Sequence, residues 1–454
     1  TKGIYITYDD PRSIKAKKTI IHNLGIAGLM DWELGMDSPN GELFQASIPD
    51  CFESQNCRFP SQTIPGGLSL SQTPQFIVLQ LEDAVTNYDF ANIGEFTFLL
   101  RNANPTYPIK DSLGCTPTFT GYFSGQNLDY NMVNYASRVG SVAMRGYTMS
   151  TTATTTASTW TSELTKLKSD FQTLAQATPI GSRAPYFTIN DDYFQTLVNM
   201  GVKFDSSMVA NNPILKSAIW PFTLDHPELI DPSLCNQFGS CPTKSYNGLW
   251  EFPIITFDYA NSLDFYNFQV TSSNYASLMT TFKNSFLATY TKNKAPRVIN
   301  LRWNYFSNGW FDTINPTKQR FVSEFLNWVT SGRNDVFFAT ESQVIDWIKN
   351  PIPLSQMLAK CGTTTCPNPQ VTPENSCPNG IQTRCAYSGG RFTVCGTQCP
   401  TTPPTLGQTY TLSSTMTGSM TDMYPTNQNV AQATNTVPSA VSYTHLTLPT
   451  NREV

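Results

Sequence analysis

The stretch 75–85, QFIVLQLEDAV, constrains the fold of this chain more than any other. Its apolar run, 76–79, continues through Leu81 into two adjacent acids, Glu82 and Asp83. A short apolar run ahead of helical patterns is typical of a buried parallel strand. In α/β proteins, binding and catalytic groups gather at the carboxyl ends of such strands. Glu82 and Asp83 are therefore the first candidate site residues.

Strand and helix patterns alternate along most of the 454 residues, which are too many for one ordinary domain. Expected strands begin at 75 and cover 117–123, 202–204, 249–257, 297–301 and 336–339. Expected helices cover 131–139, 162–174, 191–200, 317–330 and 341–348, the last with a capping box of Thr340 and Gln343. This alternation predicts an α/β fold of (β/α) barrel type over residues 74–356.

The composition favours a secreted protein. With 29 basic and 33 acidic residues, the net charge of −4 gives no electrostatic reason to expect nucleic acid or an anionic membrane as partner. The chain has no run of about 18 apolar residues, so no membrane span is expected. Eleven cysteines at short spacings, without the CxxC pairs of a zinc ribbon, indicate disulfides formed in an oxidising compartment. We therefore expect an extracellular location.

Residues 1–47 are interpreted as the end of a larger unit, because one helix at 13–24 and one strand at 26–32 cannot bury a core. The stretch 8–46, YDDPRSIKAKKTIIHNLGIAGLMDWELGMDSPNGELFQA, resembles the last βα units of a glycoside hydrolase family 18 chitinase barrel. This resemblance implies that Trp32 floors a sugar subsite, with a core position as the alternative. That family's acid motif, DxxDxDxE, is not in the sequence, so chitin cleavage is expected only of a longer parent. The start at Thr1 without a signal peptide likewise favours a fragment.

Over some 280 residues the sequence resembles the chitin deacetylases, which are polysaccharide deacetylases of carbohydrate esterase family 4. The resemblance lies in 73–85, 115–123, 181–187 (GSRAPYF), 204–208 (FDSSM), 220–225 (WPFTLD), 241–250 (CPTKSYNGLW), 295–301 and 336–347. It implies the distorted (β/α) barrel of that family. It also implies a divalent metal, held by one aspartate and two histidines, that activates water for amide hydrolysis.

The site residues implied by this resemblance are only partly those that the family uses. Asp83 falls on the metal-ligand aspartate. Glu82 falls on the catalytic base, where one extra methylene moves the carboxylate by roughly 1.5 Å. Gly146 and Ser150 stand where the family has its two ligand histidines, and Arg302 replaces the catalytic histidine.

Histidines are too few for such a metal site. The chain has three, His22, His226 and His445, whereas a zinc site of this type needs about three protein ligands. His226, beside Pro227, is expected to be an ordinary surface or capping residue. We expect no cofactor, and the alternative is Zn²⁺ bound at a functional deacetylase site.

Two arginines are expected to supply positive charge instead. Arg183, in the sequence RAPY, matches the arginine that orients the family's base, and two buried adjacent carboxylates need a counter-charge. We predict that Arg302 projects into the metal position and, with Arg183, neutralises Glu82 and Asp83. The alternative is that Arg302 is a solvated residue at a strand end. Arg145 gives only a weak indication of an anion preference.

Aromatic side chains near the expected strand ends are candidates for stacking on sugar rings. They are Tyr186, Trp220, Trp250, Trp303, Tyr305 and Trp310. Each is equally compatible with a core position, because Trp and Tyr are often buried with one polar partner.

The remaining segments are divided by cysteines and by composition. Local bonds are expected for Cys51–Cys57 and Cys235–Cys241, and the resemblance implies a bond from Cys115 to Cys361 or Cys366. Residues 48–73 predict a linker, 357–400 a Cys-rich module held by bridges, 401–440 a disordered Thr/Ser/Pro-rich tail, and 441–454 an artefact.

Together, these observations predict an extracellular, chitin-directed protein that joins a chitinase remnant to a deacetylase-like pseudoenzyme. The second domain is expected to bind chitin or a related N-acetylglucosamine polymer. Two alternatives stay open. One is an active, metal-dependent chitin N-deacetylase with an aberrant site, and the other is a structural matrix protein.

Overall fold

The computed structural model describes residues 8–23, 37, 42–43, 56–83, 109–126, 128–210, 218–236, 239–255, 270–303, 305–306, 315–359, 366, 371–373, 375–387 and 390–414. The chain divides into two compact units, Thr1–Asn56 and Cys57–Val454. In the first unit, the helix expected at 13–24 is present as α1, Pro11–Asn23. The strand expected at 26–32, with Trp32, lies outside the described residues. None of the described helices is long and apolar enough to cross a bilayer.

The second unit is built on a mainly parallel sheet of nine strands. Their order is β10-β1-β2-β3-β4-β5-β8-β7, and β11 pairs with the first half of β1. The strands are β1 Gln75–Glu82, β2 Phe119–Phe123, β3 Ser141–Met144, β4 Gly181–Ser182, β5 Phe204–Asp205, β7 Phe222–Leu224, β8 Tyr246–Glu251, β10 Arg297–Arg302 and β11 Val336–Phe338. Only the β7–β8 pair is antiparallel within this sheet. Two short strands, β6 Val209–Ala210 and β9 Ile254–Ile255, pair separately.

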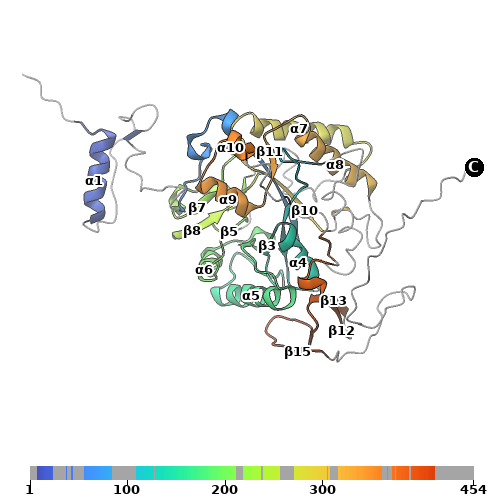
Figure 1. Ribbon diagram of the computed structural model, residues 1–454. Helices are drawn as coiled ribbons and strands as arrows, with labels where there is room; N and C mark the ends of the chain where they lie inside the picture. The colour runs from blue at the N-terminus through green and yellow to red at the C-terminus, as the bar shows by residue number, and fades with distance from the viewer. Residues whose placement is uncertain are drawn as a thin grey trace, which may run out of the picture. The chain divides into compact units, whose positions relative to one another are not determined.

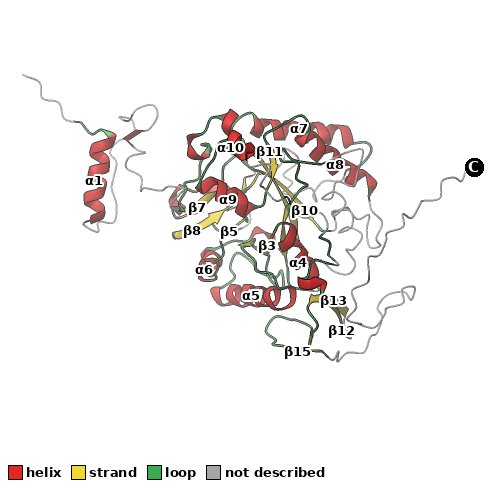
Figure 2. Cartoon of the chain, in the orientation of Figure 1, coloured by secondary structure: helices red, strands yellow, loops and turns green. Residues whose placement is uncertain are grey.

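Helices surround these strands in the second unit (Figures 1 and 2). They are α4 Tyr130–Val139, α5 Ala157–Asp170, α6 Asp191–Asn199, α7 Tyr275–Tyr290, α8 Pro316–Thr330, α9 Glu341–Lys349 and α10 Leu354–Ala359. The predicted α/β class is confirmed. The sheet is open, because among the described strands β10 and β7 end the order and do not pair with each other. β1 is buried along its whole length, as expected for a central parallel strand.

Several elements were not expected from the sequence, among them α7 and β3. Helix α7 has 16 residues, but Thr, Ser and Asn interrupt its buried apolar positions and lower its helix propensity. Strand β3 has only four residues and begins directly after Gly140, at the end of α4. A run this short has no periodicity from which a strand can be recognised.

Residues 57–73, expected to be part of a linker, instead belong to the second unit and pack beside β7. The backbone N–H of Thr223 in β7 donates to the Arg58 carbonyl (2.9 Å), and the N–H of Trp220 donates to the Ser61 carbonyl (3.0 Å). Asn293 Nδ2 also donates to the Gln62 carbonyl (2.8 Å). β7 is the last strand of the order, so its outer edge has no strand partner. This segment pairs with backbone groups on that edge, which would otherwise be open to solvent.

Disulfides crosslink several parts of the second unit. The expected Cys235–Cys241 bond is confirmed, and Cys115 bonds to Cys366. Cys57 is disulfide-bonded, but Cys51 and Cys361 lie outside the described residues. Bonds Cys377–Cys395 and Cys385–Cys399 hold the hairpin of β12, Gln382–Tyr387, and β13, Gly390–Cys395.

The expected disordered tail is ordered over its first residues. Strand β14, Cys399–Pro400, pairs with β15, Leu412–Ser413. The hydroxyl of Tyr410 donates to Asp170 at the end of α5 (2.8 Å). The composition of this segment favours disorder because it has few core residues. In the structure, the pairing of β14 with β15 and the hydrogen bond from Tyr410 to the buried Asp170 give it a defined conformation. Residues 415–454 lie outside the described part.

Asp129, directly before α4, lies at the contact between this helix and the hairpin. The N–H of Thr393 in β13 donates to Asp129 Oδ1 (2.6 Å), whereas Oδ2 has no hydrogen-bond partner among the described residues. Burial raises the pKa of Asp129 to about 6, against the hydrogen bond from Thr393 and the charges of Arg384 and Arg391. Protonation therefore favours the folded state.

We predict that Asp129→Asn stabilises the protein near neutral pH. The contribution of Asp129 to wild-type stability should fall as pH rises from about 4 to about 6, since over this range the carboxyl ionises in the unfolded chain while the buried group keeps its proton. The variant should therefore gain about 2–3 kcal/mol relative to wild type by pH 7. Thermal unfolding at pH 4 and pH 7 measures the difference. Asp231→Asn, at an exposed turn, is the control. An equal effect of Asp129→Asn at both pH values would contradict the prediction.

Candidate functional site

Charged residues lie at, or directly after, the carboxyl ends of four strands, and they meet at one edge of the sheet. Register pairs Glu82, the last residue of β1, with Arg302, the last of β10. Arg145 and Arg183 directly follow the paired ends of β3 and β4. Because β10, β1, β2, β3 and β4 are consecutive neighbours in the sheet, residues far apart in the sequence come together at their carboxyl ends.

Glu82 is buried among three guanidinium groups. Arg183 Nη1 donates to Glu82 Oε2 (3.1 Å), and Arg145 Nη1 forms an ion pair with the same oxygen. Arg302 Nε lies 3.8 Å from Oε1. Burial alone would raise the pKa of Glu82, but Arg145, Arg183 and Arg302 lower it to about 2. The carboxylate is therefore ionised at neutral pH and is a very weak base.

Asp83 contacts two of these arginines, Arg145 and Arg302. Its Oδ1 lies 3.1 Å from Arg145 Nη1, and its Oδ2 lies 3.4 Å from Arg302 Nε. The side chains of Asp83 and Arg302 are each 30% exposed, and Asp83 has a left-handed backbone with φ of 88°. Burial and the negative charge of Glu82 raise the pKa of Asp83, while Arg145 and Arg302 oppose that rise. Both carboxylate oxygens thus face guanidinium nitrogens.

Arg183 extends this network into the core. Its Nε donates to the Ser206 carbonyl (2.7 Å), its Nη1 to Asn300 Oδ1 (3.0 Å), and its Nη2 to Gln80 Oε1. Gln80 Nε2 in turn donates to Glu341 Oε1 (2.6 Å), at the start of α9. Arg183 is thereby held rigidly from several sides, so its orientation does not depend on a ligand.

A second buried acid pair lies behind this network. Asp205 and Glu251 are opposite each other in the register of β5 and β8, and both are fully buried. Tyr193 Oη donates to Asp205 Oδ1 (2.6 Å), and the N–H of Met208 donates to Glu251 Oε1 (2.9 Å). Burial raises the pKa of both carboxyl groups, and the negative charge of Asp205 raises that of Glu251 further. Burial and mutual repulsion thus both favour the protonated form of this pair.

The loop after β3 carries the two positions where the resemblance places ligand histidines. Gly146 has φ of 91°, and a Cβ on this residue would lie 2.8 Å from Pro185 Cγ. Ser150 is exposed, and its hydroxyl lies 2.5 Å from that of Thr148. Glu163 of α5 accepts the N–H groups of Tyr147 (2.5 Å) and Thr148 (2.8 Å). The backbone here is shaped for glycine.

The aromatic candidates are mostly unavailable to a sugar. Trp220, Trp250 and Trp303 are 0%, 2% and 4% exposed, because they fill the core, and Tyr305 is buried with them. The stacking role expected of these residues is therefore corrected. Tyr186 is 56% exposed, while Trp310, like Trp32, lies outside the described residues.

The residues of this site do not fit a zinc ion. Among the described residues, no group of three or more His, Cys, Asp and Glu side chains could hold a metal. His226 Nδ1 lies 3.0 Å from Glu228 Oε1 in a loop, and His445 lies outside the described residues. A cation beside Asp83 would also lie next to the guanidinium groups of Arg145 and Arg302, which repel it.

Arg145 is the site residue that sequence reasoning underestimated. It is buried and is the only side chain, among the described residues, whose nitrogen lies within 3.5 Å of both Glu82 and Asp83 oxygens. The sequence offered one signal: the short, mainly apolar run SVAM follows Gly140 directly, and Arg145 comes next. A charged residue after a short apolar run is also what marks Glu82 at the end of β1.

Comparison with known proteins identifies relatives. No family model matches the chain. Chitin deacetylase 8 of Bombyx mori is 24% identical over 402 residues, which span 84% of this chain and 96% of that protein. Chitin deacetylase 1 of Bombyx mori is 26% identical over 339 residues, which span 69% of this chain and 57% of that protein. The chain is thus homologous to chitin deacetylases, and neither relative supports the chitinase-like interpretation of residues 1–47.

Among solved structures, a polysaccharide deacetylase from Bacillus cereus is similar over 59% of this chain and 91% of its own, with 12% identity and a TM-score of 0.32. A family 4 acetyl xylan esterase from Clostridium thermocellum is similar over 62% of this chain and 95% of its own, with 12% identity and a TM-score of 0.32.

We predict that Arg145→Met lowers the free energy of unfolding by about 3–5 kcal/mol, because it leaves two carboxylates short of a counter-charge. Urea unfolding measures this. Arg320→Met, which removes an exposed ion pair with Glu324, is the control and should cost less than about 1 kcal/mol. The double variant Glu82→Gln/Arg145→Met should recover part of the loss. Equal costs for Arg145→Met and Arg320→Met would show that the buried cluster does not need Arg145.

Proposed function

We propose that this chain is a secreted, chitin-directed protein whose deacetylase-like domain binds N-acetylglucosamine polymers without metal-dependent deacetylation. The observation that carries the proposal is the set of three guanidinium groups around Glu82 and Asp83. Homology to chitin deacetylases supports chitin as the ligand class. The finer assignment of the fold, a distorted barrel of the polysaccharide deacetylase type, is part of this proposal.

Fixed cations take over the electrostatic role that a metal would have beside Asp83. Each oxygen of Asp83 faces a guanidinium nitrogen at 3.1 or 3.4 Å, so the carboxylate has counter-charges without any ion. Glu82, at the position of the base, is held ionised with a pKa of about 2. A general base works best with a pKa near the working pH, so Glu82 is poorly suited to take a proton from water.

The exposed parts of this edge suit a sugar. Tyr186 follows the end of β4 and is 56% exposed, and Asp83 and Arg302 each keep 30% of their side chains accessible. A tyrosine ring offers an apolar face to a pyranose, while a carboxylate accepts from hydroxyl groups and a guanidinium donates to hydroxyl and acetamide oxygens. Tyr186 has φ of 51°, an uncommon backbone for a non-glycine residue that is often found at functional sites.

The chitinase-like origin of residues 1–47 is proposed on the stretch 8–46 alone. A full-length transcript tests it, because an upstream DxxDxDxE motif would support a parent chitinase. A transcript that encodes no barrel strands upstream would refute it.

We predict that the purified full chain retains substoichiometric zinc, releases no acetate from chitin oligomers and is retained on chitin beads. Metal analysis, an acetate assay and a pull-down measure these three properties. Tyr186→Ala should weaken retention by roughly fivefold, since the contact between an aromatic ring and the apolar face of a sugar is expected to contribute about 1 kcal/mol. Tyr8→Ala, at an even more exposed tyrosine, is the control. Stoichiometric zinc with acetate release would establish an active deacetylase, and loss of chitin retention would favour a matrix protein.

Restoring the family's residue types should not restore a metal site. The variant Glu82→Asp/Gly146→His/Ser150→His/Arg302→His is expected to bind zinc no more tightly than wild type, because a side chain at 146 meets Pro185 on a backbone that favours glycine. Isothermal titration with Zn²⁺ measures this. The same variant with Gly146 unchanged is the control. Stoichiometric zinc binding by the complete variant alone would show that the loop accepts a histidine.

A further inference from the structure

Asp170, the last residue of α5, is a buried carboxylate shared by two distant parts of the chain. Tyr147 Oη, from the loop after β3, lies 3.2 Å from Asp170 Oδ2. Tyr410 Oη, from the C-terminal segment, donates to Asp170 Oδ1 (2.8 Å). Lys166 Nζ donates to both carboxylate oxygens (2.6 and 2.7 Å). The Asp170 side chain therefore links Tyr147, next to the candidate site, with Tyr410, which follows Tyr147 by some 260 positions in the sequence.

The loop on the site side needs external support. It begins at Arg145, whose guanidinium faces Glu82 and Asp83, and Tyr147 is only two residues further on. Gly146 and Met149 both have positive φ, 91° and 58°, and the left-handed region is unfavourable for methionine. Such a backbone persists where surrounding contacts hold it. Here these contacts include Asp170 and Glu163, which both come from α5.

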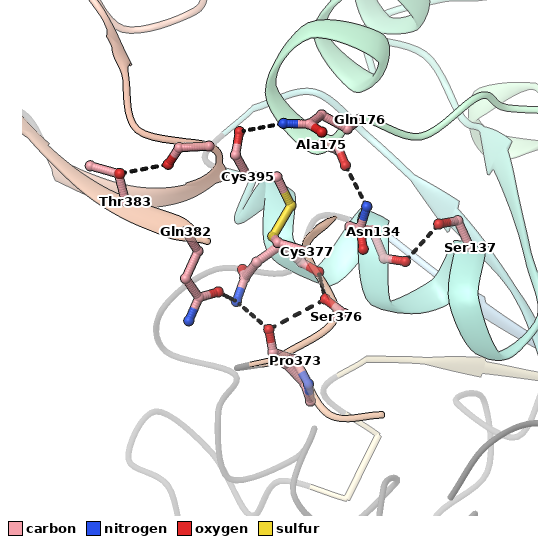
Figure 3. Close-up of a disulfide and its surroundings, with 12 residues drawn as sticks. Asn134, Ser137, Ala175, Gln176, Pro373, Ser376, Cys377, Gln382, Thr383 and Cys395 are labelled. Carbon is pink, nitrogen blue, oxygen red and sulfur yellow. Dashed lines mark hydrogen bonds between the residues drawn. A yellow bond between two sulfur atoms is a disulfide. The ribbon is translucent and has the colours of Figure 1, made fainter. Parts of the chain in front are cut away.

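The C-terminal segment can give this support because it is itself fixed. Thr401 and Thr411 pair through their backbones (2.8 Å) next to β14 and β15. The bond Cys385–Cys399 fixes its start. Figure 3 shows the neighbouring bond Cys377–Cys395. It also shows Gln176, which follows the helical turn 171–175 after α5, donating to the Cys395 carbonyl (3.2 Å).

Burial and the Asp170 carboxylate favour the protonated form of the two tyrosine hydroxyls at this junction. Lys166 Nζ lies 4.7 Å from the ring centre of Tyr410 and 5.5 Å from that of Tyr147, so it contacts both rings as well as the carboxylate. Burial and the charge of Asp170 raise the pKa of both tyrosines above the ordinary value. Both hydroxyl groups therefore remain protonated donors.

We infer that residues 399–414 are a strap that positions the loop after β3, and that Tyr410 and Asp170 are positioning residues of the candidate site. The strap acts through the Asp170 carboxylate. Without the Tyr410 hydroxyl, Asp170 loses one of its three anchors, and the loop can relax away from the conformation that directs Arg145 towards Glu82 and Asp83. The electrostatic balance of the site then depends on a segment that composition alone assigns to a tail.

Tyr410→Phe in the full chain tests this inference, because it removes one hydroxyl and keeps the ring. Hydrogen exchange of the peptide containing the Tyr147 and Thr148 amides should accelerate by roughly fivefold or more. Tyr290→Phe is a matched control. Tyr290 likewise donates to a buried carboxylate, Asp335, which also binds a lysine that lies over the tyrosine ring. Unchanged exchange of the loop in Tyr410→Phe, or equal acceleration in Tyr290→Phe, would overturn the inference.

A second measurement separates positioning from general stability. Tyr410→Phe should weaken binding of a chitin hexamer by roughly threefold, whereas Tyr290→Phe should leave it unchanged at a comparable fall in Tm. This readout rests on the proposed function, but hydrogen exchange does not. Accelerated loop exchange in a protein that binds no hexamer would refute the proposed function and support the strap. Hexamer binding that is unchanged in Tyr410→Phe would refute a positioning role for Tyr410.

Discussion

The burial of two adjacent carboxylates at the end of the central strand is the constraint on which the rest of this structure depends. A carboxylate removed from water costs several kcal/mol unless it is paired, and Glu82 and Asp83 are neighbours that also repel each other. Arg145, Arg183 and Arg302 meet this requirement from three other strands. The sheet order is thus tied to charge pairing as well as to apolar burial.

The cluster is balanced by charges deeper in the core. Through Gln80, Arg183 connects to Glu341, so that three arginines are linked with three carboxylates in one network, which is buried except at Asp83 and Arg302. Such networks stabilise a fold only when nearly every member has partners, and they then fix side-chain orientations strongly. This rigidity gives the site a defined shape from its own side chains. It also explains why the loop after β3, which carries Arg145, is itself anchored by two acids of α5.

Homology to chitin deacetylases and the chemistry of the site lead to different expectations. Overall similarity reflects the many positions that build the sheet and its covering helices, whereas catalysis depends on a few residues at strand ends. The strand ends of this chain carry three guanidinium groups around Glu82 and Asp83. Similarity over the whole chain therefore does not decide the chemistry of the site, and the binding role proposed above rests on these residues.

The sequence by itself determined the α/β class, most helices, the Cys235–Cys241 bond and the position of the acid pair at a strand end. These follow from local signals: apolar periodicity, capping residues, short cysteine spacing and the end of an apolar run. It could not show that Trp220, Trp250 and Trp303 are buried, because an aromatic residue near a strand end has the same local pattern in a core and in a sugar site. Residues 57–73 and 401–414 were likewise assigned by composition, which does not report contacts with distant segments.

Only the tertiary structure decided that Arg145 faces both acids and that Tyr410 reaches Asp170. The reason is that these contacts join residues separated by tens to hundreds of positions, and their partners are set by strand order and register. Charge type and spacing along the chain predict that buried acids need cations. Which cations supply them is decided by the folded sheet.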